Sequence, residues 1–164
     1  MDTFNEAMLE YRKQLAKGQI QKAYKGLMDY MLGLKTHFKD KHPGYFVSGS
    51  LYSGYMDMTY FAIIPESLKQ RKLKIALVFN HQAFHFEAWL AGYNKQVQTQ
   101  YWQFFKASGW NQYALVPDTK GEDAILQHVL ADTPDFSDLA SLTGQLERET
   151  LTFIADIENF LSKP

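Results

Sequence analysis

The sequence has 164 residues, of which 46% are hydrophobic and 15% aromatic, and its formal net charge is −1. A chain of this length can bury a core without disulfides, and the composition excludes disordered and repetitive fibrous proteins. With 17 basic against 18 acidic residues, it lacks the positive charge from which nucleic-acid-binding proteins gain most of their affinity. It has no cysteine, which excludes thiolate metal sites and cysteine nucleophiles.

Two helices are predicted at the start of the chain. Apolar residues recur every three to four positions over residues 4–16 and again over residues 20–40, a spacing typical of amphipathic helices. Gly18 stands where the first helix would be capped, and the segment Lys41-His42-Pro43-Gly44 would end the second. We expect the two helices to form an αα-hairpin with buried apolar stripes.

A first β-hairpin is predicted over residues 45–64. Two runs of strand-forming residues flank Ser53-Gly54, and a two-residue loop of this kind would place Tyr52 opposite Tyr55. In this register one face of the hairpin is apolar. The other face carries a polar stripe that lies between aromatic pairs. The stripe consists of Ser48, Ser50, Asp57 and Thr59.

A second hairpin is predicted over residues 73–90. Its strands, 73–79 and 84–90, flank the loop 80–83 and place Phe79 opposite Phe84. One face is again apolar, and the other is mixed, with Lys74, His85, Glu87 and Trp89.

Four further elements complete the chain. The pattern predicts a helix over 92–106, a strand over 110–116, a short helix over 122–130 and a long amphipathic helix over 139–161. Consecutive hairpins favour an antiparallel sheet. We therefore expect a single α+β domain over residues 1–164. Its sheet would have about five strands, two hairpins plus one later strand, packed against the N- and C-terminal helices.

The polar stripe of the first hairpin has the composition of a ligand site. Short hydroxyl side chains and Asp57 between aromatic walls provide a few polar anchors in an apolar lining. The simpler interpretation is a sheet with one solvated face, which requires such residues in any case.

On the second hairpin, His85 and Glu87 share a face and could act as an acid–base pair or bind a metal together. Here the simpler interpretation is a polar cross-strand patch in which Lys74 pairs with Glu87.

Common catalytic and nucleotide-binding motifs are absent from the sequence. The element order weakly resembles the PD-(D/E)xK nuclease core, with Asp57 and Glu87 as the metal-binding acids. That chemistry requires a lysine two residues after the second acid, and Trp89 occupies this position. The resemblance therefore implies an inactive site.

A second resemblance rests on the segment Phe86–Lys95, with Leu73–Phe79 before it and Gln98, Tyr101 and Trp102 after it. Together these residues resemble an uncharacterised bacterial domain-of-unknown-function family over most of the chain. The resemblance implies a bacterial cytoplasmic protein. It implies no activity, cofactor or catalytic residue.

The predicted function is a non-enzymatic module that binds a small molecule or a protein on the polar faces of the hairpins 45–64 and 73–90. Its candidate binding residues are Ser48, Ser50, Asp57, Thr59, His85, Glu87 and Trp89. The alternative is a small metal-assisted hydrolase or a degenerate nuclease-like domain that uses Asp57, His85 and Glu87.

No cofactor or bound metal is expected, and the charge balance argues against nucleic acid as a partner. No apolar run approaches the roughly 18–20 residues of a membrane span, and the acidic N-terminus is no signal peptide, so we expect a cytoplasmic location without membrane contact. The aromatic-rich composition is compatible with a homodimer.

Overall fold

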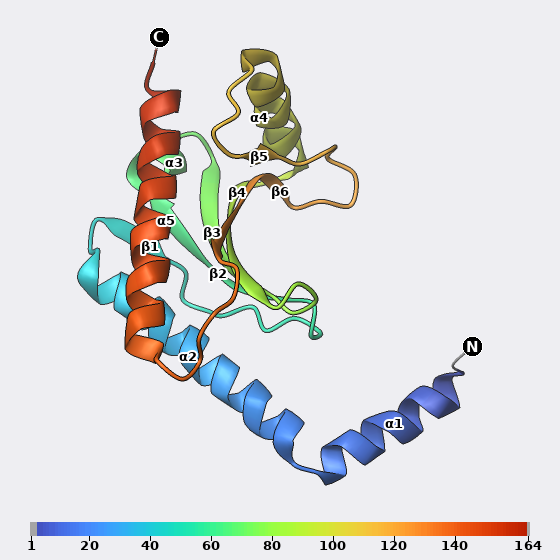
Figure 1. Cartoon of the computed structure of the whole chain (residues 1–164). Coiled ribbons are helices and arrows are strands. Elements are labelled where there is room, and N and C mark those ends of the chain that lie inside the picture. Colours follow the sequence, from blue (N-terminus) through green and yellow to red (C-terminus); the bar gives the residue numbers. More distant parts are fainter. Residues whose placement is uncertain (1–2, 164) are drawn as a thin grey trace. The chain divides into compact units, whose positions relative to one another are not determined.

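The structure is a computed structural model that describes residues 3–163. The chain divides between Leu34 and Lys35 into two compact units. The first contains α1 (Phe4–Ala16) and most of α2 (Gln19–Lys41) (Figure 1). Thr3 and Glu6 cap α1 reciprocally through side chain and backbone. No residue of α1 is buried, so the predicted buried stripe is not found on this helix.

The second unit is built on a six-stranded sheet, β1 (Tyr45–Val47), β2 (Met58–Pro65), β3 (Leu73–Asn80), β4 (His85–Gly92), β5 (Ala114–Leu115) and β6 (Ala124–Ala131). The strand order is β1-β2-β3-β4-β6-β5, and every neighbouring pair is antiparallel. The short helix α3 (Glu66–Lys69) joins β2 to β3. The predicted α+β class with an antiparallel sheet is confirmed, with six strands in place of about five.

Helices lie against both faces of the sheet (Figure 1). The long helix α5 (Leu139–Leu161) packs on one face, called the α5 face below, with Phe153, Ile154 and Ile157 fully buried. The helix α4 (Lys95–Ser108) packs on the opposite face, called the α4 face.

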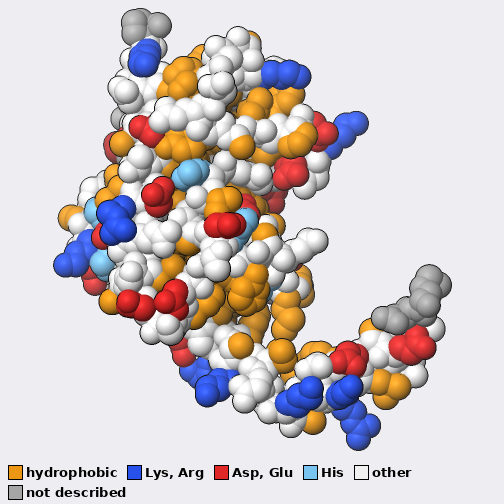
Figure 2. Space-filling model, in the orientation of Figure 1, with side chains coloured by type: hydrophobic (Ala, Val, Ile, Leu, Met, Phe, Trp, Pro, Cys, Tyr) orange, Lys and Arg blue, Asp and Glu red, His pale blue; other side chains and the backbone are white. Residues whose placement is uncertain are grey.

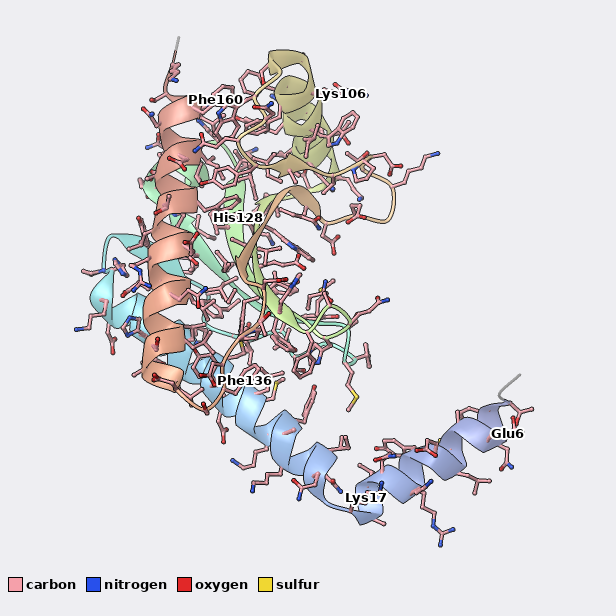
Figure 3. All side chains as sticks on the ribbon, in the orientation of Figure 1. Glu6, Lys17, Lys106, His128, Phe136 and Phe160 are labelled. Carbon is pink, nitrogen blue, oxygen red and sulfur yellow. The ribbon has the colours of Figure 1, made fainter. Side chains whose placement is uncertain are left out.

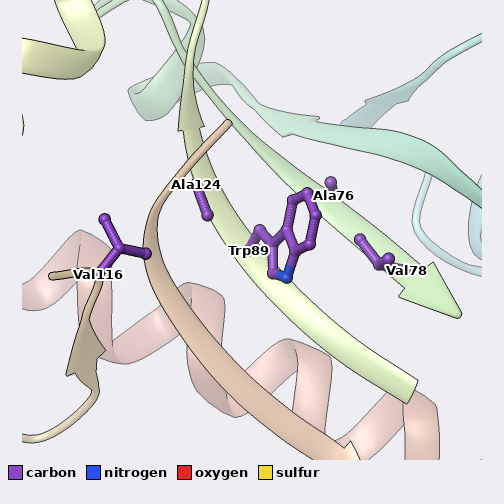
Figure 4. Packing of buried hydrophobic residues seen from close by; sticks show 5 residues of the cluster. All are labelled: Ala76, Val78, Trp89, Val116 and Ala124. Carbon is purple, nitrogen blue, oxygen red and sulfur yellow. The ribbon is translucent and has the colours of Figure 1, made fainter. Parts of the chain in front are cut away.

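The core of the α4 face is centred on Trp89 (Figure 4). The indole packs among small and branched side chains from three segments, Ala76, Val78, Val116 and Ala124. Met58, Tyr60 and Trp102 pack against this cluster and are only partly buried.

The predicted tight turn at Ser53-Gly54 is wrong. Tyr45 pairs with Pro65 and Val47 with Ile63, and a long loop, 48–57, follows β1. In this loop Gly54 and Met56 adopt positive φ angles of 73° and 61°. The carboxylate of Asp57 accepts the backbone N–H of Tyr55 at 2.8 Å, so a side chain organises the turn instead of a strand-to-strand ladder. This register differs from the predicted one by three residues, an odd shift that changes which side chains of the two strands share a face.

The second hairpin is displaced by two residues from its predicted register. Asn80 pairs with His85 and Phe79 with Phe86, and the loop covers residues 81–84. Phe84 has a φ of 58° and lies outside the strand. A two-residue shift leaves every side chain on its original face, so the predicted faces of this hairpin are correct.

The segment predicted as a short helix over 122–130 is the strand β6, which lies between β4 and β5. Ala124, Ile125 and Leu126 are all buried, as in a strand covered on both faces. Such a run of apolar residues also fits helical spacing, so periodicity alone cannot separate the two. The strand predicted over 110–116 is reduced to the two residues of β5.

Candidate functional site

Glu87 occupies an unusual position for a carboxylate, because it lies inside the sheet on the α4 face. It is 7% exposed and lies between Val78 of β3 and Val129 of β6. Removing an ionised carboxylate from water is costly unless hydrogen-bond donors replace the lost hydration. The surroundings of Glu87 therefore have to supply such donors.

Three side chains donate to Glu87. The indole Nε1 of Trp89 donates to Oε1 at 2.7 Å, and Asn80 Nδ2 donates to Oε2 at 3.0 Å. His85 Nε2 also donates to Oε2, at 2.5 Å. The alternation of β4 puts His85, Glu87 and Trp89 on one face, and Asn80 reaches them as the cross-strand partner of His85. We call these four residues the Glu87 network.

The buried carboxylate fixes the orientation of the His85 ring. Because Nε2 donates to Glu87, the second ring nitrogen, Nδ1, faces the other way, towards Asp132. Nδ1 lies 3.6 Å from Asp132 Oδ1, beyond ordinary hydrogen-bond length. The Asp132 side chain is 87% exposed and the His85 side chain 14%, so Nδ1 lies next to an exposed carboxylate. An imidazole held in this way can accept or donate a proton or bind a polar group.

Beside the network, part of the α4 face is accessible. One row of side chains crosses the strands through Tyr52, Tyr60, Val78, Glu87 and Val129. Tyr52 is 47% and Val129 43% exposed at the two ends of the row. The surface is hollowed between the segment preceding β6 and the tips of β2, β3 and β4 (Figure 2). We call the Tyr52–Val129 row and its neighbours Met58, Asn80 and His85 the open face.

The tyrosines of the open face form a pair. The rings of Tyr52 and Tyr60 lie 4.9 Å apart, centre to centre, and their backbones form an isolated bridge. Burial raises the pKa of Tyr60, and the charge of Asp123 and the neighbouring Tyr52 raise it further. Asp123 directly precedes Ala124 of β6, which belongs to the cluster that Tyr60 packs against.

The seven residues predicted as one site lie in different environments. His85, Glu87 and Trp89 are together in the Glu87 network. Thr59 is completely buried on the α5 face, because it pairs with Phe79 of β3. The polar stripe of the first hairpin and the mixed face of the second are therefore on opposite sides of the sheet.

The three remaining candidates belong to the loop 48–57. Ser48 Oγ donates to the backbone oxygen of Ser50 and accepts from Ala62 N at 3.0 Å. Hydrogen bonds from the backbone N–H groups of Tyr55 and Met58 lower the pKa of Asp57. These contacts are local and shape the loop, and none of them joins Asp57 to the Glu87 network.

A second polar cluster lies on the opposite side of the unit and was not predicted. His37 Nε2 and His42 Nε2 donate to the same oxygen of Glu147, Oε2, at 2.9 and 2.8 Å. His42 also stacks on Tyr45. Burial acts to raise the pKa of Glu147, but the bonds from His42 and His37 outweigh it, and the net shift is downward. No sequence signal indicated this contact, because its partners are more than a hundred residues apart.

Further polar contacts join β6 and its neighbours to α5. His128, labelled in Figure 3, stacks on Phe153, and its Nε2 lies 3.4 Å from Glu149 Oε2. Tyr113 donates its hydroxyl to Asp156 at 2.5 Å, and burial and this carboxylate raise its pKa. Across residues 3–163, no three His, Asp or Glu side chains are arranged to hold a metal ion.

Comparison with known proteins gives a family without an activity. Residues 4–161 match the family described as Domain of unknown function (DUF7000). The chain belongs to this family. No curated protein and no solved structure matches this DUF7000 chain. None of its helices within the described residues 3–163 is long and apolar enough to span a membrane.

Proposed function

We propose that this DUF7000 protein is a small-ligand-binding module, and that the ligand binds on the open face against His85. The observation that carries the proposal is the Glu87 network, a buried carboxylate whose two oxygens accept three hydrogen bonds. One of these bonds orients an imidazole whose other nitrogen faces an exposed side chain.

The energetics favour a functional role for the network over a purely structural one. An apolar side chain of similar volume in the core usually serves stability as well as a buried charge, or better. A fully satisfied polar network is, however, rigid, and it fixes the position of each member. Such rigidity suits a site that must present His85 in one orientation to a ligand.

The setting matches that of small-molecule sites. These sites are concave and mostly apolar, with a few polar groups that fix the orientation of the ligand. On the open face the apolar part consists of Tyr52, Tyr60, Met58 and Val129, and the polar part of His85 and Asn80. The hollow in Figure 2 gives the required shape.

The test is a two-dimensional NMR screen of the ¹⁵N-labelled full chain against charged and neutral metabolites. A ligand of the open face should shift the backbone signals of Tyr60 and Val129 and the indole signal of Trp89. Tyr52→Ala should lower the affinity of the protein for such a ligand. Tyr55→Ala, at a position 91% exposed, should leave the affinity unchanged. If every ligand shifts signals elsewhere, or no compound binds, the proposal is wrong.

The second candidate function is acid–base catalysis by His85. It is favoured by one specific feature, the hydrogen bond from His85 to a buried carboxylate, an arrangement used by catalytic histidines. Asp57 takes no part, because its carboxylate is bonded to the loop backbone. A metal-assisted form of this function predicts that Mg²⁺, Mn²⁺ or Zn²⁺ at millimolar concentration raises the melting temperature. An unchanged melting temperature with all three ions would argue against it.

The proposal includes a cytoplasmic location in a bacterial cell. It is supported by the absence of cysteine, which suits a reducing compartment. Fractionation of cells that express the tagged chain from its own promoter would test the location directly.

A further inference from the structure

We propose that the ligand of the open face is an organic cation, an amine or a quaternary ammonium group seated on the Tyr52–Tyr60 pair. This inference rests on the proposed function and specifies the chemical class of its ligand.

The tyrosine pair supplies the first argument. Aromatic ring faces carry negative electrostatic potential and attract cations within about 6 Å of the ring centre. The ring centres lie 4.9 Å apart, the ring planes are tilted by 34°, and Tyr52 is 47% exposed, so part of this aromatic pair is open to a ligand. The residue next to Tyr60 in the row is Val78, which is fully buried, so the surface beside the two tyrosines is apolar. A cation held there is shielded from water on one side, which strengthens its attraction to the rings.

Charge complementarity supplies the second argument. Asp132 lies beside His85 on the open face, and a second carboxylate, Asp123, directly precedes Ala124, which belongs to the cluster that Tyr60 packs against. The ammonium of Lys95 approaches the same segment but is bonded to the carbonyl oxygens of Thr119 and Glu122, at 2.8 and 2.7 Å. An anionic ligand would face both carboxylates, whereas a cation would be attracted by them.

The geometry also suggests how an amine would be held. The gap of 3.6 Å between His85 Nδ1 and Asp132 Oδ1 separates two groups that can each accept an N–H donor. Neighbouring strands are about 4.8 Å apart, so Tyr60 and Glu87, two strands apart, are separated by about 10 Å. An aliphatic chain of a few carbon atoms can therefore place its charged end on the tyrosines and a donor near His85.

The test compares two probes of nearly the same shape, choline and its uncharged isostere 3,3-dimethyl-1-butanol. Each is titrated into the ¹⁵N-labelled full chain while the signals of Tyr60, Val129 and the Trp89 indole are followed. Choline should bind at least about ten-fold more tightly than the neutral alcohol, the difference expected of a cation on aromatic rings. Tyr52→Ala and Asp123→Asn should each weaken choline binding several-fold.

Two matched variants serve as controls. Tyr55→Ala removes a tyrosine that is 91% exposed, and Asp40→Asn removes an exposed carboxylate of α2. Both should leave the affinity for choline unchanged, and unchanged spectra away from the open face show that each variant is folded.

The outcomes separate this inference from the proposed function. Equal affinity for the two probes would show that the ligand is not an organic cation, and so would binding of neutral metabolites without binding of choline. In both cases the open face would still be a binding site. If neither probe nor any metabolite shifts the signals of the open face, both proposals fail.

Discussion

Glu87 shows how a single residue can depend on its neighbours for its place in the fold. Its carboxylate is tolerated inside the sheet only because Trp89, His85 and Asn80 donate to it. The dependence is mutual, since the indole and amide N–H groups of these partners would themselves be buried without an acceptor. Hydrogen bonds to a charged group contribute more to stability than bonds between neutral groups.

A conservative change at this position is therefore expected to destabilise the fold. Glu87→Gln keeps the shape but turns one acceptor oxygen into an N–H₂ group that faces a donor. We expect the free energy of unfolding to fall by about 1–3 kcal/mol, the cost of leaving a buried polar group unsatisfied. Urea unfolding followed by circular dichroism measures it. Glu149→Gln, at a half-exposed site, should have little effect. Equal stability of Glu87→Gln and the wild type would contradict this account of the network.

Glu147 gives a prediction for the dependence of stability on pH. Its pKa in the folded protein lies below the ordinary value of 4.5, because the bonds from His42 and His37 outweigh the effect of burial. A carboxylate with a lowered pKa contributes stability above its unfolded pKa and loses it as the pH falls through the folded value. Between pH 6 and pH 3 the wild type should therefore lose more stability than Glu147→Gln. Unfolding curves at several pH values test this, and parallel losses would contradict it.

At the scale of elements, the helices were predicted better than the strands. The long helix α5 begins at Leu139 and ends at Leu161, as its amphipathic pattern predicted, and Asp138 caps it. The faces of β3 and β4 were also correct, since alternation survives a two-residue shift. The turn after β1 was not predictable from alternation, because the Asp57 side chain determines it. The strand β6 was missed because its apolar run fits a buried strand and a helix equally well.

The junction of β4 and α4 depends on the small size of Gly92. A Cβ added there would lie 2.6 Å from the backbone nitrogen of Gln98, which α4 cannot move aside without losing its first turn. Gly92→Ala should therefore lower stability by about 1–3 kcal/mol, the usual cost of overpacking. Gly44→Ala, where a Cβ meets nothing within 4 Å, is the control and should change stability by less than about 0.5 kcal/mol. Thermal unfolding of both variants provides the measurement.

For the whole molecule, contacts between distant segments were the hardest part to predict. The Glu147 contacts with His37 and His42 span 110 and 105 residues, and neither composition nor spacing marks them. Only part of the candidate site could be predicted, because its residues come both from one strand and from a distant loop. His85, Glu87 and Trp89 share one strand, so alternation places them together, whereas Tyr52 reaches the open face from the loop 48–57, whose course alternation does not predict.

The sheet topology also predicts an order of folding. β2, β3 and β4 are joined by short connections, but β6 pairs with β4 only after the chain has passed through α4 and β5. Local contacts form at a lower entropic cost than distant ones. Ile75→Val in β3 should therefore slow folding, whereas Ile125→Val in β6 should mainly speed unfolding. Stopped-flow kinetics in urea would show this, and a larger effect of Ile125→Val on the folding rate would contradict it.

The indole of Trp89 gives the protein a built-in optical reporter. Its N–H is bonded to Glu87, which also holds His85, so a change in charge or hydration at the open face should alter the local field at the ring. The emission of an indole depends on that field. Trp102 donates to a backbone carbonyl and Trp110 stacks on Phe160, and the emission of both adds to that of Trp89. Ligands of the open face should therefore be detectable by intrinsic fluorescence of the unlabelled chain.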